Sequence, residues 1–269
     1  NRSKQFVWLS RKLDWDMTEK IKAMKIEGLA FIKESKRSYP NAQMASQTIG
    51  FAGLDNVGLD GLEMRYDTYL KGTPGWTYVL RDARQRSVSI TDVLQPPVDG
   101  YSLVLTIDQV IQYIVEREID KVFTKYHAKG AMIVVLDVKT GEILALANRP
   151  AYDLNDPSRY PIDARRNRCV TDYFEPGSVF KIVTASAALD TGKFSLGDKL
   201  FCENGEYRVA NHTLHDVHPY GWLTFKEVIG QSSNIGTTKI AQKIRPRALY
   251  DYGKAFGFGH PTGSRITSE

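Results

Sequence analysis

The feature that most constrains how this chain can fold is a largely apolar run over residues 179–189, which begins inside the segment Glu-Pro-Gly-Ser-Val-Phe-Lys at residues 175–181. Pro176-Gly177 interrupts any preceding element, and Asp190-Thr191-Gly192 supplies a stop, with its glycine expected just past the helix end. These signals predict a buried helix whose first turn holds Ser178.

Ser178 and Lys181 are three positions apart, just under one helical turn, so both side chains are expected on one helix face. A serine hydroxyl becomes a useful nucleophile when a base takes its proton, and a lysine with a lowered pKa can be that base. Free N–H groups at a helix start favour developing negative charge. A bare Ser-x-x-Lys arises by chance about once in a chain of this size. The helical context therefore favours an acylating serine over a serine that merely begins a core helix.

A second candidate group follows at Ser232-Ser233-Asn234. The hydroxyl of Ser232 can pass a proton, and the amide of Asn234 can hold both a lysine and a substrate carbonyl. Alone, such a segment is more often a turn or a helix cap. Combined with Ser178 and Lys181, it predicts the opposite wall of a catalytic cleft.

In this order and spacing, the chain resembles the class B penicillin-binding proteins, which cross-link peptidoglycan. The resemblance covers nearly the whole chain and is closest to the cell-division (septal) branch, with an elongation or sporulation relative still open. The stretches that carry it are 49–51, 58–63, 66–67, 70–72, 167–178, 215–224 and 232–234.

The family also has a third motif, Lys-Thr-Gly or Lys-Ser-Gly, that comes after Ser-x-Asn. The literal copy at residues 139–141 precedes Ser178 and separates two short apolar runs, so we expect it to be a hairpin turn. The end segment 256–263 lacks the lysine. No apolar run approaches the roughly 20 residues of a membrane span. We therefore expect an internal piece of a longer protein, without its anchor and third motif and incomplete as an enzyme.

The resemblance implies an α+β fold. Residues 1–97 would be a smaller, partial non-catalytic module of the pedestal or dimerisation type. Residues 98–269 would be the N-terminal part of a transpeptidase domain related to serine β-lactamases, a β-sheet flanked by a helical cluster and lacking its last strands. Gln95-Pro96-Pro97 is the linker signal between them.

The resemblance also implies the chemistry. Ser178 would attack the penultimate D-Ala of a stem peptide, and Lys181 would take its proton. Ser232 would relay a proton to the leaving amine, and Asn234 would position Lys181 and the substrate. Penicillin would acylate Ser178. No metal or cofactor is needed. Expected partners are peptidoglycan stem peptides, β-lactam antibiotics, a polytopic glycan polymerase and other division proteins, on the outer face of the plasma membrane behind one N-terminal anchor.

Several element positions follow from local patterns. An amphipathic helix is expected near residues 18–35 and a strand over 76–80. Residues 101–107 alternate as a strand would, and Asp108 should cap a helix that runs to about Tyr126.

Other function classes are less favoured. The net charge of +5 and the pI of about 9.0 would suit nucleic acid, but the basic residues are dispersed among acids, so nucleic acid is not an expected partner. His212, His215 and His218 could bind zinc, yet their Pro- and Gly-containing segment need not bring the rings together. Cys169 and Cys202 could pair in an oxidising compartment, although two free buried thiols are favoured.

Three alternatives to a transpeptidase remain. A serine β-lactamase and a β-lactam sensor domain share Ser-x-x-Lys and Ser-x-Asn, but both lack a module of about a hundred residues before the catalytic domain. The third is a non-catalytic division scaffold that docks partners through residues 1–97.

Overall fold

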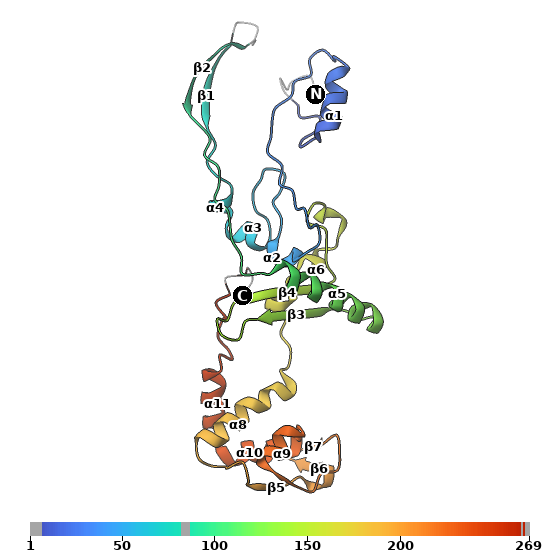
Figure 1. Ribbon diagram of the computed structural model, residues 1–269, viewed down its shortest axis with the longest axis vertical. Helices are drawn as coiled ribbons and strands as arrows, with labels where there is room; N and C mark the ends of the chain where they lie inside the picture. The colour runs from blue at the N-terminus through green and yellow to red at the C-terminus, as the bar shows by residue number, and fades with distance from the viewer. Residues whose placement is uncertain (1–6, 82–86, 265, 267–269) are drawn as a thin grey trace. The chain divides into compact units, whose positions relative to one another are not determined.

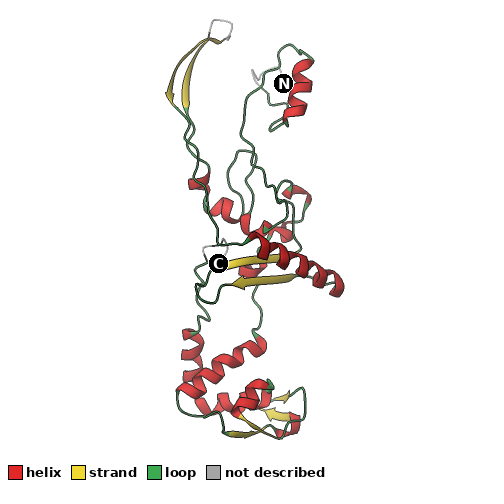
Figure 2. Ribbon diagram, viewed as in Figure 1, coloured by secondary structure: helices red, strands yellow, loops and turns green. Residues whose placement is uncertain are grey.

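The computed structural model describes residues 7–81, 87–264 and 266. They form two compact units, divided between Asp172 and Tyr173, with Ile266 also belonging to the first unit (Figure 1). Both units combine helices with pairs of antiparallel strands, as the expected α+β class requires (Figure 2). The domain boundary expected after residue 97 stays a prediction.

The first unit begins with four short helices and a long strand pair and continues into a helix that packs on a hairpin. In chain order its elements are α1 (Trp15–Ala23), α2 (Ser46–Ile49), α3 (Gly61–Arg65), α4 (Asp67–Leu70), β1 (Trp76–Arg81), β2 (Ser87–Gln95), α5 (Gln109–Tyr126), β3 (Ala131–Leu136), β4 (Ile143–Arg149), the 3₁₀ turn η1 (Pro157–Arg159), α6 (Ile162–Arg165) and α7 (Arg168–Thr171).

The second unit contains the helices and short strands around the predicted nucleophile. Its elements are η2 (Gly177–Phe180), α8 (Lys181–Asp190), β5 (Lys199–Phe201), η3 (Glu203–Gly205), β6 (Glu206–Val209), β7 (His212–His215), β8 (Trp222–Thr224), α9 (Phe225–Gly230), α10 (Asn234–Ile244) and α11 (Pro246–Ala255). β5 pairs with β8 and β6 with β7, both antiparallel.

The helix expected over residues 18–35 is wrong in its extent. α1 ends at Ala23, and the backbone then turns through Lys25 (φ 50°) and Gly28 (φ 82°), conformations that cannot continue a right-handed helix. α1 itself buries none of its residues. An amphipathic pattern alone did not sustain a long helix, because tertiary packing of the apolar face supplies most helix stability.

Of the two strands expected near the linker, one is confirmed. β1 begins at Trp76 and pairs antiparallel with β2. Residues 101–107 form no strand: the backbone there is irregular, with Thr106 Oγ1 donating to the Ile143 carbonyl at 2.7 Å. Val104 is 92% exposed, so the alternating pattern has no buried face to line.

Asp108 caps α5 as predicted, because its carboxylate accepts hydrogen bonds from the backbone N–H groups of Val110 and Ile111, both at 2.9 Å. α5 buries Val115 and Ile119 against the β3–β4 hairpin. The side chain of Gln112 extends that packing with two hydrogen bonds to the backbone of Leu146, at 3.0 and 2.8 Å.

The predicted hairpin turn at Lys139-Thr140-Gly141 is confirmed between β3 and β4. Asp137 Oδ1 accepts from the backbone N–H groups of Lys139 and Thr140 at 2.7 and 3.0 Å. Gly141 then takes a φ of 76°, which glycine adopts without steric penalty. This copy of the motif is a turn of the first unit.

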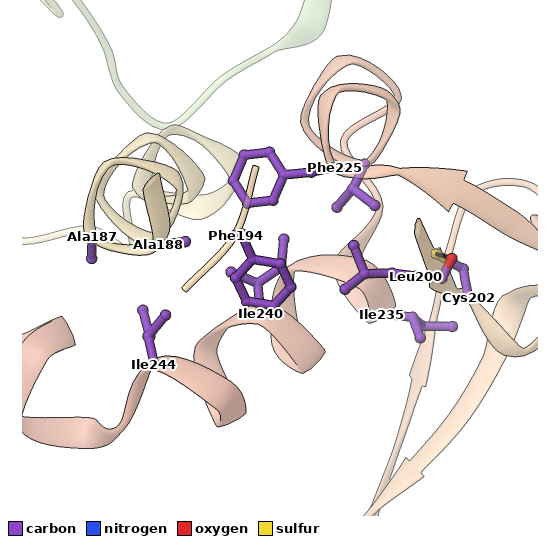
Figure 3. Packing of buried hydrophobic residues seen from close by; sticks show 10 residues of the cluster. Ala187, Ala188, Phe194, Leu200, Cys202, Phe225, Ile235, Ile240 and Ile244 are labelled. Atoms are coloured by element: carbon purple, nitrogen blue, oxygen red, sulfur yellow. Dashed lines mark hydrogen bonds between the residues drawn. The ribbon is translucent and has the colours of Figure 1, made fainter. Parts of the chain in front are cut away.

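The core of the second unit lies between α8, α9 and α10 (Figure 3). Ala187 and Ala188 give α8 a small-residue face, and α10 packs Ile240 and Ile244 in the same cluster. Large rings fill the remaining space, and the centroids of Phe194 and Phe225 are 5.7 Å apart. This core fixes α8 relative to α10, the two helices that carry the candidate site.

α8 is buried on one face only. Val183, Thr184, Ala187 and Ala188 are buried, as predicted for this helix, whereas Ile182 on α8 and Val179 in the preceding turn are 55% and 68% exposed. Gly192 has a φ of 64° just past the helix end, as predicted.

The two cysteines are free, as favoured from the sequence: Cys202 is buried in the second unit and Cys169 lies partly buried in the first. In the described ranges, none of the helices has the length and apolarity needed to cross a bilayer.

Candidate active site

Ser178 and Lys181 lie on consecutive turns at the start of α8. Gly177 enters with a φ of 58°, and Ser178 falls in the 3₁₀ turn η2, not in the first α-helical turn as expected. Lys181 is the first residue of α8. The Pro-Gly pair explains the difference, because it sets a tight turn before regular helix begins. The Ser178 side chain is exposed and Lys181 is partly buried.

Ser232 lies in the connection between α9 and α10, and Asn234 is the first residue of α10. The end of α9 has the Schellman pattern, with Ser233 N–H bonded to the Val228 carbonyl at 2.9 Å and Ser232 N–H to the Ile229 carbonyl at 3.1 Å. Ser232 occupies the left-handed position, with a φ of 55°, where glycine is usual. α10 begins at Asn234, and Ser233 caps it by accepting from the Gly236 N–H at 2.9 Å.

All four predicted side chains come together in the second unit. Lys181 Nζ donates to the Ser232 carbonyl at 2.5 Å, to Ser232 Oγ at 3.0 Å and to Asn234 Oδ1 at 2.7 Å. Ser232 Oγ lies 3.1 Å from Ser178 Oγ. A hydrogen-bonded path therefore joins Ser178 to Lys181 through the hydroxyl of Ser232.

Two opposing effects set the basicity of Lys181. Partial burial lowers the pKa of Lys181 below its usual value of 10.5, because desolvation disfavours the ammonium. The negative charge of Asp216 acts in the opposite direction and raises that pKa. A lowered pKa makes the neutral amine, which can accept a proton, more accessible near neutral pH.

Sequence reasoning gave no role to Asp216, which lies between β7 and β8. Its Oδ1 accepts from the backbone N–H groups of Asn234 at 2.5 Å and Ile235 at 3.1 Å, and its Oδ2 accepts from Ser233 Oγ at 2.6 Å. The neighbouring carbonyl of His215 accepts from Asn234 Nδ2 at 2.9 Å. The sequence signal that could have pointed to Asp216 and His215 was their position in residues 215–224, a stretch that carries the family resemblance.

The histidines flank this region. His212 and His215 belong to β7, and His218 contacts the Tyr220 ring edge-to-face at 5.8 Å between centroids. The Tyr220 hydroxyl donates to Gln231 Oε1 at 3.2 Å, next to Ser232 in sequence. Over the part of the chain that the structure describes, no group of three or more His, Cys, Asp or Glu residues is arranged to hold a metal ion.

The arrangement contains the groups that acyl transfer needs. Ser178 offers an exposed hydroxyl, Ser232 connects that hydroxyl to an amine, and Asn234 holds the amine. The N–H of Ser178 is in the first turn of a helical segment, where such groups lack intrahelical partners and can bind an oxyanion.

Two family models match the chain. The model described as the penicillin-binding protein dimerisation domain matches residues 1–105, and the model of the penicillin binding protein transpeptidase domain matches residues 131–269. The second match takes in every side chain of the candidate site. The order of the two matches agrees with the expected order, a non-catalytic module before a transpeptidase domain.

Curated relatives match the chain over nearly its full length. The probable peptidoglycan D,D-transpeptidase PenA of Neisseria meningitidis is 38% identical over 96% of this chain and 44% of its own length. The peptidoglycan D,D-transpeptidase FtsI of Escherichia coli K12 is 35% identical over 100% of this chain and 45% of its own. Stage V sporulation protein D of Bacillus subtilis is 37% identical over 96% and 41%. The chain thus spans less than half the length of these relatives.

Solved structures resemble the fold as well. The apo form of penicillin binding protein 3 from Mycobacterium tuberculosis superimposes with a TM-score of 0.74 and 34% identity, over 87% of this chain and 49% of that one. The same protein in complex with ampicillin gives the same values. Because the transpeptidase model covers more than half of the chain and the dimerisation model covers its beginning, this chain belongs to the class B penicillin-binding proteins.

Proposed function

We propose that the gene product containing this chain is a serine D,D-transpeptidase that cross-links peptidoglycan stem peptides. The observation that supports this most directly is the hydrogen-bonded series from Ser178 Oγ through Ser232 Oγ to Lys181 Nζ and Asn234 Oδ1. Such a series connects a weak nucleophile to a base with a lowered pKa, which is how a serine is activated. The names of the relatives support the same reaction.

In the acylation step, Ser178 Oγ bonds to the carbonyl carbon of the penultimate D-Ala. The Ser178 proton moves through the Ser232 hydroxyl to neutral Lys181, and the Ser178 N–H contributes to holding the oxyanion. The C–N bond to the terminal D-Ala then breaks, and the proton returns from Lys181 through Ser232 to the leaving amine. The products are an ester on Ser178 and free D-Ala.

In the second step, an amine of a neighbouring stem peptide attacks the ester carbonyl. The new amide bond forms, the bond from Ser178 Oγ to the carbonyl carbon breaks, and the proton lost by the attacking amine restores the Ser178 hydroxyl through the same path. Asn234 keeps Lys181 in place throughout and offers its amide to the substrate. A β-lactam would imitate the acyl donor and leave a slowly hydrolysed ester on Ser178.

We infer that the setting is septal cell-wall synthesis, the branch that the sequence resembles most. The protein would be held in the plasma membrane by one N-terminal anchor, with the domains described here on the outer face. A polytopic glycan polymerase and other division proteins would be its partners. The family match to a dimerisation domain over residues 1–105 is consistent with a docking role for that part of the chain.

The experiment that tests the proposal is intact-mass measurement of the gene product containing residues 1–269 after mixing with benzylpenicillin, beside a Ser178→Ala variant. We expect a gain of one drug mass in the parent and none in the variant. A parent that is never acylated would overturn the proposal. The dimerisation-type region would then be tested for partner capture, the result expected of a scaffold.

The lifetime of the adduct separates a transpeptidase from the related hydrolases. A slow loss of the added mass is expected for a transpeptidase, because water is excluded from the acyl-enzyme. Rapid recovery of the unmodified mass with continuous drug consumption would identify a serine β-lactamase instead.

A further inference from the structure

We propose that Asp216 is a positioning residue of this active site: its carboxylate fixes Ser233, Asn234 and Ile235 against the end of β7. The inference rests on the transpeptidase function proposed above. It goes beyond that function because it assigns a task to a side chain outside the Ser-x-x-Lys and Ser-x-Asn motifs. Asp216 acts through Asn234 and Lys181 and is separated from Ser178 by them.

The contacts of Asp216 are directional and use both carboxylate oxygens. Oδ1 accepts from two consecutive backbone N–H groups, those of Asn234 and Ile235, at 2.5 and 3.1 Å. Oδ2 accepts from Ser233 Oγ at 2.6 Å. One carboxylate thus ties down three successive residues at the start of α10, where the unpaired N–H groups and the helix dipole favour a negative charge.

The same contacts set the orientation of the Asn234 amide. Its Nδ2 donates to the carbonyl of His215, the residue before Asp216, at 2.9 Å. With Nδ2 committed to that carbonyl, Oδ1 is left to accept from Lys181 Nζ at 2.7 Å. The residue pair at the end of β7 therefore decides which amide atom faces the lysine, a choice that a free asparagine would not make.

The Ser233 hydroxyl completes the arrangement from inside the protein. Ser233 is 1% exposed, and its Oγ accepts from the Gly236 N–H at 2.9 Å while it donates to Asp216. A buried hydroxyl that both donates and accepts a hydrogen bond is held in a single orientation. The middle serine of Ser-Ser-Asn is thereby explained as the link between Asp216 and the first turn of α10.

Asp216 also acts on Lys181 through charge. Burial lowers the pKa of Lys181, and the carboxylate of Asp216 opposes this effect. Without that charge the ammonium would be less stable, and the lysine would lose its proton at a lower pH. Asp216 therefore favours the ammonium form of Lys181, the form that donates to Ser232 and Asn234 and can return a proton to the leaving group.

Other ionisable groups lie on the helices packed against α8, and among the described residues the carboxylate of Asp216 is a charge that raises the pKa of Lys181 against the effect of burial. These groups are Lys226 and Glu227 on α9, Lys239 and Lys243 on α10, and Arg247, Tyr250, Asp251, Tyr252 and Lys254 on α11. At the far end of α8, Asp190 accepts from the Tyr252 hydroxyl. Replacing Asp216 is therefore the specific way to change the charge that Lys181 experiences.

The test is the second-order rate constant for acylation by benzylpenicillin, measured against pH in the gene product that contains this chain. Asp216→Asn keeps one oxygen that can accept from the two backbone N–H groups, replaces the acceptor facing Ser233 Oγ by a donor and removes the charge. We expect most of the alkaline plateau rate and an acid limb displaced to lower pH. Asp216→Ala removes both the acceptor oxygens and the charge, so we expect the same displacement of the acid limb and a loss of roughly a hundredfold in the alkaline plateau rate, the cost of a misplaced site.

Asp198→Asn is the matched control. Asp198 accepts hydrogen bonds from the Ser195 backbone N–H and hydroxyl, both at 2.9 Å, so like Asp216 it is an aspartate that binds backbone and serine side-chain donors. Its substitution removes one negative charge from the same unit. We expect its pH profile to match that of the parent. Thermal unfolding of each variant separates a misplaced site from an unfolded one, and if Asp216→Ala does not fold, Asp216→Asn carries the test.

The outcomes are distinct. A parent that is not acylated on Ser178 overturns the proposed function, and this inference with it. An acylated parent whose Asp216→Asn variant keeps the parental acid limb overturns the charge role alone. A folded Asp216→Ala variant with the parental rate overturns the positioning role.

Discussion

Two turns of this protein solve the same backbone problem with different residues. The β3–β4 turn at Lys139-Thr140-Gly141 and the α9–α10 turn at Ser232-Ser233-Asn234 each contain a residue with positive φ, Gly141 at 76° and Ser232 at 55°. Each is held by an aspartate that accepts from two consecutive backbone N–H groups.

The partners of the two turns differ. Asp137 lies two and three residues from the groups it binds, so the hairpin turn is closed locally. Asp216 is 18 and 19 residues from its backbone partners, so the second turn depends on the tertiary fold. The first turn uses glycine, which fits the left-handed position at no steric cost, whereas the second accepts a serine there. The hairpin turn only has to satisfy its own backbone, whereas the α9–α10 turn must also place the Ser232 hydroxyl within hydrogen-bonding distance of Lys181.

The largest difference in acylation rate is expected between variants of two lysines: Lys181, which contacts the α9–α10 turn, and Lys139, which lies in the hairpin turn. Lys181→Met removes the proposed base, so acylation by a β-lactam should fall by up to about 10⁴-fold. Lys139→Met changes an exposed turn and should leave the acylation rate unchanged. The measurement is the acylation rate constant of both variants. An equal loss in the two would mean that the hairpin copy of Lys-Thr-Gly has a catalytic role.

For Ser232→Gly we expect a smaller loss in acylation rate than for Lys181→Met, together with a gain in the free energy of unfolding. The variant gives the α9–α10 turn the glycine that the hairpin already has. Relief of the left-handed serine, roughly 1–2 kcal/mol, should exceed the added chain entropy of glycine, about 0.5–1 kcal/mol. We expect unfolding to cost about 0.5 kcal/mol more, while acylation falls about a hundredfold for want of the relay hydroxyl.

Ser232→Ala is the control, because it removes the hydroxyl and retains the Cβ. It should lose acylation as Ser232→Gly does without the gain in stability, as measured by urea unfolding. A Ser232→Gly variant less stable than Ser232→Ala would show that the left-handed serine carries no strain.

Gly236→Ala tests how tightly α10 holds the second turn. A Cβ at Gly236 would lie 2.6 Å from Val228 Cγ1 and 3.1 Å from Ser233 Oγ, and Val228 is fully buried and stiff at χ1. We expect a loss of about 1–3 kcal/mol in the free energy of unfolding and a moderate loss of acylation. Gly253→Ala, on α11 with nothing near the added Cβ, should be tolerated. Unchanged unfolding of Gly236→Ala would show that α9 and α10 adapt freely.

The smallest effect is expected for Asp137→Ala in the hairpin. Hydrogen bonds from the backbone N–H groups of Lys139 and Thr140 hold the pKa of the Asp137 carboxyl below its usual value. A depressed pKa means that this carboxylate stabilises the fold above its unfolded pKa and that the contribution disappears as the pH falls through the folded pKa. The variant should be slightly less stable at neutral pH and equal to the parent in acid. A change in the acylation rate of Asp137→Ala would contradict the prediction that the hairpin turn has no part in acylation.

Much of the candidate site could be predicted because its signals are local. The Pro-Gly break and the apolar run located the start of α8, and the order of Ser-x-x-Lys and Ser-x-Asn identified four residues that the fold brings together. The hairpin turn and the Asp108 cap were also read correctly, since each depends on residues within three positions. Ser178 was placed in an α-helical turn and lies in a 3₁₀ turn, a distinction that short segments do not encode clearly.

The errors fall where local pattern and tertiary packing disagree. Residues 18–35 have an amphipathic helical pattern, but α1 stops at Ala23 because its apolar face is not buried. Residues 101–107 alternate like a strand, yet they lack a face to cover. Hydrophobic periodicity shows which face of a segment is apolar, but only the tertiary structure shows whether another element packs against that face.

By itself, the sequence determined the family, the α+β class, the four candidate site residues that the fold brings together, and the turn at Gly141. The tertiary structure decided how those residues are connected: it placed Ser232 between Ser178 and Lys181, turned the Asn234 amide toward the lysine and brought Asp216 to the start of α10. The physical reason is range. Helix caps and turns are set by bonds between residues a few positions apart, whereas a carboxylate that accepts hydrogen bonds from residues 18 positions away is chosen only when the whole unit packs.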